Sequence, residues 1–185
     1  MQPGRRNPAP ERMQLLQAFI NTNDVEAHRD ELATPAQVAS WLSLRNLATA
    51  DLRLTDADRQ WTVSVREALR DLIDARDKGL DATHARSVLD AAARSAGLRL
   101  SFDTHRSVLT PTRGGIRGAV GRIVATLPLA MADPDWSRLK TCHNDACRWV
   151  FYDSSRNRSS HWCTMAICGN RVKARAYRAR TRGAT

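Results

Sequence analysis

The chain has 185 residues, of which 42% are hydrophobic and 26% are charged, and its formal net charge at pH 7 is +10. This length suits one ordinary domain plus a small appendage, with enough apolar residues to bury a core. No run approaches the roughly 18 uninterrupted apolar residues of a membrane span, and the N-terminal MQPGRRNPAP lacks the apolar stretch of a secretory signal. We therefore expect a cytoplasmic protein that does not insert into a membrane.

The positive charge is concentrated in the last quarter of the chain. Residues 1–137 hold 18 Lys and Arg against 17 Asp and Glu, a net charge of +1, whereas residues 138–185 hold 11 against 2, a net charge of +9. A localised basic field is typical of a module that binds phosphates, since each neutralised phosphate releases condensed counterions. The alternative interpretation is a solvated basic tail.

The first part of the chain is predicted to be helical. Residues 1–10 contain three prolines and two arginines and are predicted to form a disordered arm. From residue 11 to residue 137, apolar residues recur three or four positions apart, which indicates a helical domain. Thr34 and Gln37 form a capping box around Pro35 at the first helical position, and Thr55 caps a second helix. The faces expected to be buried carry Val38, Trp41 and Leu42 in one helix and Trp61, Val65, Leu69, Leu72 and Ile73 in the other.

A short β-hairpin is predicted after a further helix that ends at Gly97. Leu98, Leu100 and Phe102 alternate with polar residues, which predicts one half-buried strand, and residues 107–110 can pair with it. Helical spacing returns after Gly115, and Pro128 should end or bend that helix. The predicted fold is therefore mainly α with a small β-hairpin, an α+β arrangement.

Four cysteines give the most specific signal in the chain. Cys142, Cys147, Cys163 and Cys168 form two C-x4-C clips separated by fifteen residues. In a reducing compartment, clustered thiols more often hold a metal than form disulfides, and this spacing suits one structural four-thiolate zinc ion. Because four thiolates fill a tetrahedron, a catalytic zinc is not expected. His143 and His161 are alternative ligands that could replace one cysteine.

The segment from residue 138 to residue 185 is predicted to be a small zinc finger, with a treble-clef or ribbon-like knuckle, a strand and a terminal helix. Trp149 and Phe151 lie on one face of the predicted strand. The terminal helix is rich in alanine and arginine, which are strong helix formers. The residues predicted to contact nucleic acid are Arg156, Arg158, Asn170, Arg171, Lys173, Arg175, Arg178, Arg180 and Arg182.

The segment Cys168-Gly169-Asn170-Arg171 resembles the motif of the CGNR zinc finger of bacterial proteins. The resemblance extends from about residue 138 to residue 182 and includes both cysteine clips and the basic helix. In that family the preceding helical domain is called ABATE, and residues 19–22, Thr34-Pro35 and Trp41-Leu42 look like its recurring features. The resemblance implies a stress-induced transcription regulator with a DNA-binding finger.

The preferred hypothesis is a zinc-containing, DNA-binding transcription regulator with an N-terminal domain for signal sensing or oligomerisation. One alternative is an RNA-binding protein that uses the same finger. Another is a small-molecule receptor whose finger is a structural or interaction module. Asn21 and Thr22 are candidate ligand-binding residues, although a helix termination explains them equally well. A homodimer and a small-molecule effector are further expectations, and no enzymatic motif is recognised in residues 1–137.

Overall fold

The computed structural model describes residues 7–102, 104–105 and 107–182. Its helices are α1 (Glu11–Ile20), α2 (Pro35–Ser43), α3 (Asp56–Lys78), α4 (Thr83–Ala96), α5 (Gly115–Val124), α6 (Leu127–Met131) and α7 (Asn170–Arg182), with the short turns η2 (Trp136–Arg138) and η3 (Met165–Gly169). Three antiparallel pairs of strands join β1 (Asn23–Asp24) to β2 (Arg29–Asp30), β3 (Leu98–Phe102) to β4 (Ser107–Pro111), and β5 (Leu139–Thr141) to β6 (Val150–Tyr152). The predicted mainly helical fold is confirmed.

The helix ends follow the signals in the sequence. The hydroxyls of Thr34 and Thr55 each accept a hydrogen bond from the backbone N–H three residues later, at 3.2 Å in both cases. Helix α4 ends at Gly97, whose φ of 61° is the left-handed conformation that favours glycine. Helix α5 ends at Val124, before Pro128, which lies in the first turn of the short helix α6.

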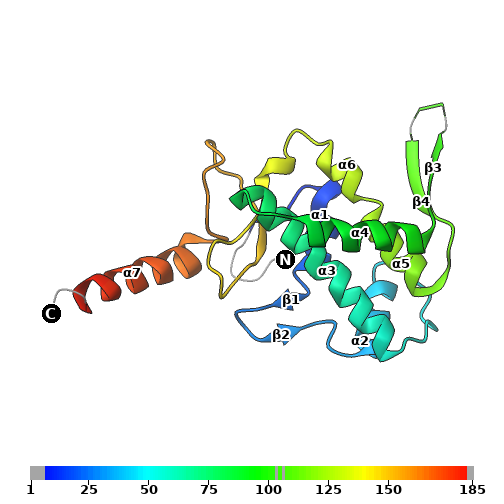
Figure 1. Cartoon of the computed structure of the whole chain (residues 1–185), viewed down its shortest axis with the longest axis horizontal. Coiled ribbons are helices and arrows are strands. Elements are labelled where there is room, and N and C mark those ends of the chain that lie inside the picture. Colours follow the sequence, from blue (N-terminus) through cyan, green and yellow to red (C-terminus); the bar gives the residue numbers. More distant parts are fainter. Residues whose placement is uncertain (1–6, 103, 106, 183–185) are drawn as a thin grey trace.

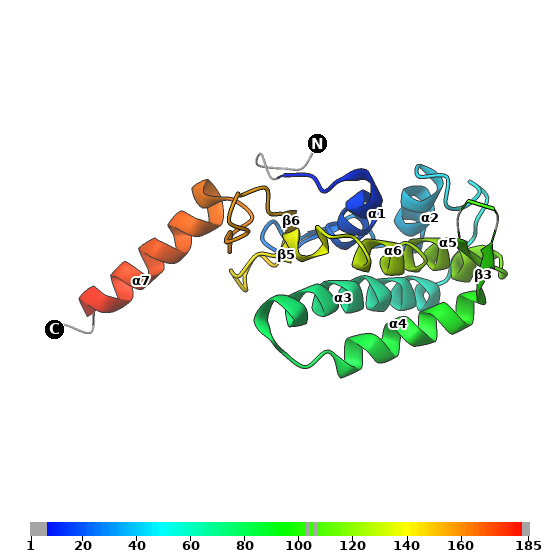
Figure 2. The same ribbon diagram turned by 90° about the horizontal axis from the view of Figure 1, so that it is seen from above.

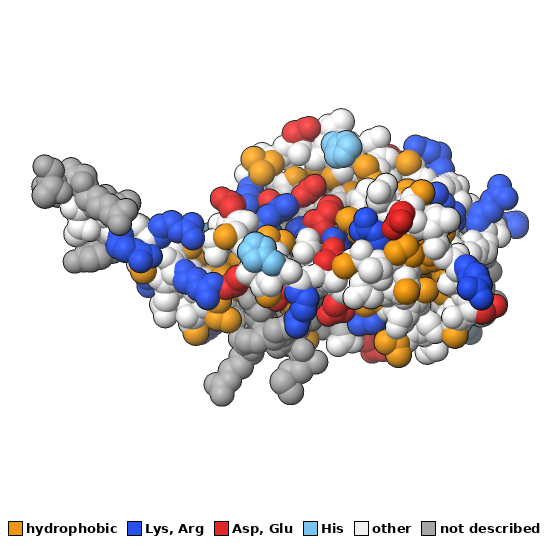
Figure 3. Space-filling model, turned by 90° about the horizontal axis from the view of Figure 1, so that it is seen from below, with side chains coloured by type: hydrophobic (Ala, Val, Ile, Leu, Met, Phe, Trp, Pro, Cys, Tyr) orange, Lys and Arg blue, Asp and Glu red, His pale blue; other side chains and the backbone are white. Residues whose placement is uncertain are grey.

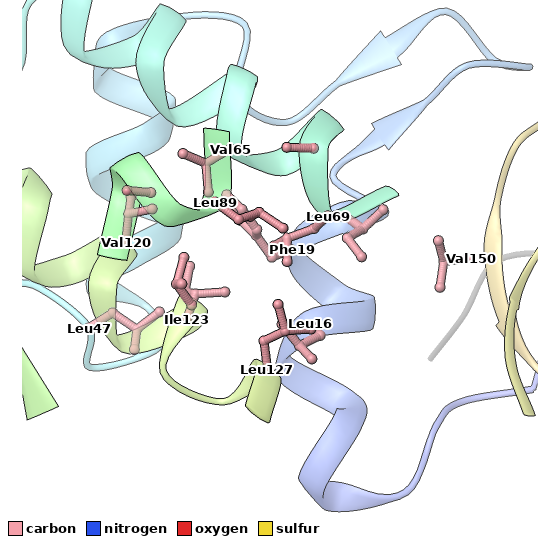
Figure 4. Close-up of a cluster of buried hydrophobic side chains, with 14 of the residues drawn as sticks. Leu16, Phe19, Leu47, Val65, Leu69, Leu89, Val120, Ile123, Leu127 and Val150 are labelled. Atoms are coloured by element: carbon pink, nitrogen blue, oxygen red, sulfur yellow. The ribbon is translucent and has the colours of Figure 1, made fainter. Parts of the chain in front are cut away.

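The core lies between α1, α3, α4 and α5. Helices α3 and α4 run side by side, α1 packs against α3, and α5 packs against α4 (Figures 1 and 2). Figure 4 shows Leu16 and Phe19 of α1 meeting Leu69 of α3 and Ile123 of α5 at the centre of this core. Trp41 is buried as predicted, whereas Trp61 is half-buried beneath the Arg117 guanidinium, 3.8 Å from the ring centroid.

The predicted hairpin forms, but its burial was predicted wrongly. Leu98 is half-buried, whereas Leu100 and Phe102 are 49% and 77% exposed. The hairpin extends beyond the ends of the neighbouring helices, so no described element covers the outer part of its apolar face (Figure 1). The alternation of apolar and polar residues predicts the strand correctly but does not show how far the strand projects beyond the helices.

Strand β6 lies between two apolar clusters. Val150 packs with Leu139 into the core of the helical part, and Val150 stands beside α1 in Figure 4. Trp149 and Phe151, on the opposite side of the chain, pack with the four cysteines. Alternate side chains of this strand are therefore buried on opposite faces, so that β6 belongs equally to the finger and to the helical core.

Residues 7–10 of the predicted disordered arm are packed against the body. The side-chain oxygen of Gln17 accepts a hydrogen bond from the backbone N–H of Ala9 at 2.7 Å, and Ala9 is buried. The side chain of Asn7 donates to Ser154 at 2.9 Å. These bonds hold Asn7 and Ala9 against the body, and residues 1–6 of the predicted arm lie outside the described part of the chain.

Candidate metal centre and nucleic-acid interface

The first cysteine clip is the turn that joins β5 to β6. The N–H of Cys142 donates to the carbonyl of Trp149 at 2.9 Å, which continues the pairing of the two strands. Inside the turn, the carbonyl of Asn144 accepts from the N–H groups of Cys147 and Arg148, at 2.7 and 3.1 Å. Arg148 has a φ of 50°, so the chain reverses sharply there and re-enters the strand. These bonds point both thiols of the clip to one side.

The second clip is the turn that starts the terminal helix. The Thr164 hydroxyl accepts from the N–H of Ile167 at 3.1 Å and so caps η3. The carbonyl of Thr164 accepts from the N–H groups of Cys168 and Gly169, at 3.1 and 3.2 Å. A Cβ on Gly169 would lie 2.5 Å from the sulfur of Met165, so a larger residue at this position would require the flexible Met165 side chain to move. Gly169 is therefore in close contact with Met165 of its own turn.

The four sulfur atoms converge to the geometry of a tetrahedral site. All four lie within 4.8 Å of one another, and all four cysteines are buried. The sulfurs of Cys147 and Cys163 are 3.8 Å apart, and those of Cys163 and Cys168 are 3.6 Å apart. A zinc ion with four Zn–S bonds of about 2.3 Å places its sulfurs roughly 3.8 Å apart. The donor set and its spacing fit one structural zinc ion.

The thiols cannot all ionise unless a cation is bound. Hydrogen bonding to the Cys142 and Cys163 thiols, together with burial, raises the pKa of Cys147. The pKa of Cys142 rises to about 12, because the contact with Cys163 and burial outweigh the opposing contact with Cys147. A bound divalent cation reverses this balance and deprotonates coordinating thiols. Without a bound cation, Cys142 and Cys147 therefore stay protonated at neutral pH.

The neighbours of the sulfurs support the cysteines as ligands. The Asn144 side-chain amide lies 3.7 Å from the sulfur of Cys168, as a weak donor to that ligand. His143 and His161 stack on each other, with ring centroids 4.7 Å apart, and neither belongs to the convergent group found among the described residues. The alternative in which a histidine replaces a cysteine is not supported by this geometry.

Acidic residues on one face of α3 hold the finger. Asp71, Asp74 and Asp77 recur every three residues and point towards β5 and the first clip. Asp71 pairs with Arg148 at 2.6 Å, Asp74 accepts from the Thr141 hydroxyl at 2.5 Å, and Asp77 accepts from the Thr141 N–H at 3.2 Å. The finger is thus fixed against the helical part by directional bonds as well as by the shared core.

Asn21 and Thr22, the candidate ligand-binding pair, have partners within the chain. The Asn21 amide accepts from the N–H of Val150 at 2.9 Å and donates to the carbonyl of Val150 at 2.7 Å, in the way a neighbouring strand would. The Thr22 hydroxyl accepts from the buried Arg66 at 3.2 Å. An external ligand would have to displace these bonds.

Helix α7 carries most of the predicted nucleic-acid contacts and projects away from the rest of the molecule (Figures 1 and 2). Lys173, Arg175 and Arg178 are exposed, and none of them forms an ion pair with another described residue. The side chains of Arg180 and Arg182 lie outside what the structure describes, as does everything beyond residue 182. Figure 3 shows basic side chains along the visible part of this end, whereas acidic and basic side chains alternate over the helical part.

Two of the predicted phosphate contacts are engaged by acidic residues. Arg171, at the start of α7, pairs with Glu26 in the turn between β1 and β2. Arg158 pairs with Asp135 at 3.3 Å. Arg156, in the same loop as Arg158, is exposed, and Asn170 is exposed at the first position of α7. Most of the predicted contact residues therefore lie on α7, where Arg171 is partnered by Glu26, whereas Arg156 and Arg158 lie in the loop between the two clips.

Sequence reasoning missed the residues that join the two parts. Asp71, Asp74 and Asp77 lie on one helical face, and this spacing is visible in the sequence. Glu26 and Asn21 carry no such signal, because their partners are more than a hundred residues away along the chain.

Comparison with known protein families gives two matches in order along the chain. The ABATE family model, described as "Putative stress-induced transcription regulator", matches residues 14–136. The CGNR zinc finger model matches residues 138–181. No curated protein matches the chain. Separately, none of the helices that the structure describes is long and apolar enough to cross a bilayer.

Proposed function

Because the chain belongs to the ABATE family and carries a CGNR zinc finger at its C-terminal end, we propose that it is a DNA-binding transcription regulator. The observation that carries the proposal is α7, an exposed basic helix that starts directly at the second cysteine clip. The metal fixes the start of this helix, so zinc serves to orient a binding surface. Because four thiolates leave no open coordination position on the zinc, we also propose that the protein is not an enzyme.

The contacts to nucleic acid would come mainly from the exposed side of α7. Lys173, Arg175 and Arg178 have no acidic partner among the described residues, so a phosphate can neutralise them without breaking an ion pair. Arg180 and Arg182 continue the same helix. A projecting helix of this kind can enter a major groove, where an arginine can reach guanine. Residues 1–137, at a net charge of +1, add little to this field.

The helical domain is proposed to sense a signal or to form oligomers, and it is joined rigidly to the finger. The bonds from α3 and Asn21 to β5 and β6 supply a physical route between the two parts. Sedimentation of the zinc-loaded chain at several concentrations tests the proposed homodimer. A thermal-shift screen of small metabolites tests the proposed effector.

The central experiment is a fluorescence-anisotropy titration of the zinc-loaded chain against duplex DNA at several salt concentrations. Each neutralised phosphate contributes about 0.9 to the slope of log affinity against log salt. The double variant Arg175→Ala, Arg178→Ala should therefore have a slope about 1.8 less steep than the wild type. The matched control, Arg53→Ala with Arg99→Ala, removes the same charge from exposed positions in the helical part and should retain the slope. An equal change in both double variants, or no change in either, contradicts the proposal.

RNA binding is the alternative class of partner. A competition titration with structured RNA against the bound duplex separates the two. If RNA displaces a duplex of equal length preferentially, the proposed partner becomes RNA instead of DNA.

A further inference from the structure

The finger contains a recess beside the start of α7. Its volume is about 550 Å³, within the range of roughly 300–1,000 Å³ that is typical of small-molecule sites. The loop that joins the two cysteine clips forms most of its wall, and Asn7 closes one side. The described residues that line it include Tyr152, Asp153, Ser159, Ser160, His161 and Trp162.

The lining suits a flat, uncharged, polar ring better than an anion. It offers the aromatic side chains of Tyr152, His161 and Trp162 together with several serine hydroxyls, and no Lys or Arg is among the described lining residues. The Asp153 carboxylate accepts from Lys140 at 2.8 Å and from the N–H of Ser160 at 2.9 Å. A phosphate inside the recess would lie near this carboxylate without a lining cation to offset it.

Exposed cations lie on the two chain segments that leave the recess. Met165 lines the recess and begins η3, which runs directly into α7 with its exposed Lys173 and Arg175. On the loop side, exposed Arg156 follows the lining residue Ser155. A strand held by its phosphates on these cations would therefore pass the opening of a recess lined by aromatic side chains and serine hydroxyls.

We propose that this recess takes one unstacked base of a nucleic-acid strand whose phosphates lie on α7. The inference rests on the nucleic-acid binding proposed above and adds to it a site for a base. Unpaired bases are held in proteins by stacking on aromatic side chains and by hydrogen bonds to their edges. Half-buried Trp162 and exposed His161 supply the stacking surfaces, and the hydroxyls of Ser159 and Ser160 supply the edge contacts.

The test compares strands that carry the same phosphates with and without bases. The zinc-loaded full chain is titrated with oligothymidylate, with an abasic strand of equal length, and with a perfect duplex. Stacking of one base is worth about 5- to 150-fold in affinity, so the abasic strand should bind more weakly than oligothymidylate by a factor in that range.

A variant that fills the recess provides the second arm. Ser159→Phe places a ring in the recess at an exposed position whose side chain forms no bond that the fold needs. It should abolish the difference between oligothymidylate and the abasic strand and leave duplex binding unchanged. The matched control, Asn157→Phe, places the same ring at an exposed position of the same loop that does not line the recess, and it should keep the difference.

The outcomes separate this inference from the proposed function. Binding to the duplex without any preference for bases over the abasic strand overturns the base site and leaves the proposed function standing. Loss of binding to every nucleic acid overturns the proposed function itself. Free thymidine monophosphate is added as a competitor. If the recess binds this free nucleotide but no base of a strand, the assignment of the recess to a strand is overturned.

Discussion

The pairing of Arg171 with Glu26 predicts that one cation of α7 is masked before nucleic acid binds. Glu26 belongs to the turn between β1 and β2, and Arg171 lies at the start of α7. The Arg171 side chain is 58% exposed, so the ion pair itself is worth only about 0–1 kcal/mol of folding free energy. A phosphate and the Glu26 carboxylate would compete for the same guanidinium. Glu26→Gln should therefore release Arg171 for binding without unfolding the protein.

The magnitude follows from counterion release. One additional neutralised phosphate makes the slope of log affinity against log salt steeper by about 0.9. Between 50 and 200 mM salt, a fourfold change, the affinity of Glu26→Gln should fall by about 3.5-fold more than that of the wild type. The assay is the anisotropy titration with duplex DNA, and urea unfolding should show a stability within about 1 kcal/mol of the wild type.

Two further variants test whether the contact is the cause. Glu26→Gln combined with Arg171→Ala should return the slope to the wild-type value, because the released cation is gone. Glu31→Gln removes the same charge at an exposed position nearby and should not change the slope. An unchanged slope in Glu26→Gln, or an equal increase in Glu31→Gln, would refute the competition. Weaker binding by Glu26→Gln would also refute it, since Glu26 would then be positioning the helix.

Three other predictions concern the link between the finger and the helical part. Removal of zinc by a strong chelator should abolish duplex binding. In calorimetry it should also lower the temperature of a single cooperative unfolding transition, because β6 lies in both apolar clusters. Two separate unfolding transitions would contradict this. Asn21→Ala should lower the free energy of unfolding in urea by about 1–3 kcal/mol, since the Val150 N–H loses its partner while the Val150 carbonyl keeps its bond from Gln17. The control Asn157→Ala should leave the free energy of unfolding almost unchanged. Burial alone would raise the pKa of Glu67, but Arg70 and Arg66 lower it below its ordinary value of 4.5. The stability that Glu67 confers should therefore be complete above pH 4.5 and decrease as the pH falls below that value. The difference in the free energy of unfolding between the wild type and Glu67→Gln should then become smaller in acid. A difference that does not change with pH would contradict this.

Local signals in the sequence were sufficient for most of the helices, for the pairing of β3 with β4 and for the metal ligands. The hydroxyls of Thr34 and Thr55, the left-handed Gly97 and the two cysteine clips act within a few residues, so the sequence displays each of them directly. The terminal helix was predicted from residue types alone and begins at Asn170. These features depend on chemistry between near neighbours, which a single sequence contains in full.

The remaining features depend on partners distant along the chain. Asn21 read equally well as a ligand contact or a helix end, because nothing local shows that Val150 will lie beside it. Leu100 and Phe102 alternate like buried residues, yet their burial depends on whether a distant element reaches the hairpin. Arg171 shares a helical face with Arg175, yet Arg171 forms an ion pair with Glu26. Tertiary packing therefore decided which side chains of a correctly predicted pattern remain available for function.

The placement of β6 limits how a signal could reach α7. Because β6 packs against the helical core on one side and the metal cluster on the other, a movement of α1 that shifts Asn21 must either break its bonds to Val150 or displace the strand. Displacement of β6 would move the first cysteine clip, and the metal would transmit that movement to the second clip and the start of α7. The Glu26 contact supplies a second, exposed connection from β1 and β2 to the same helix. If the proposed function holds, the buried connection would set the direction of α7 and the exposed one would set how many of its cations are available.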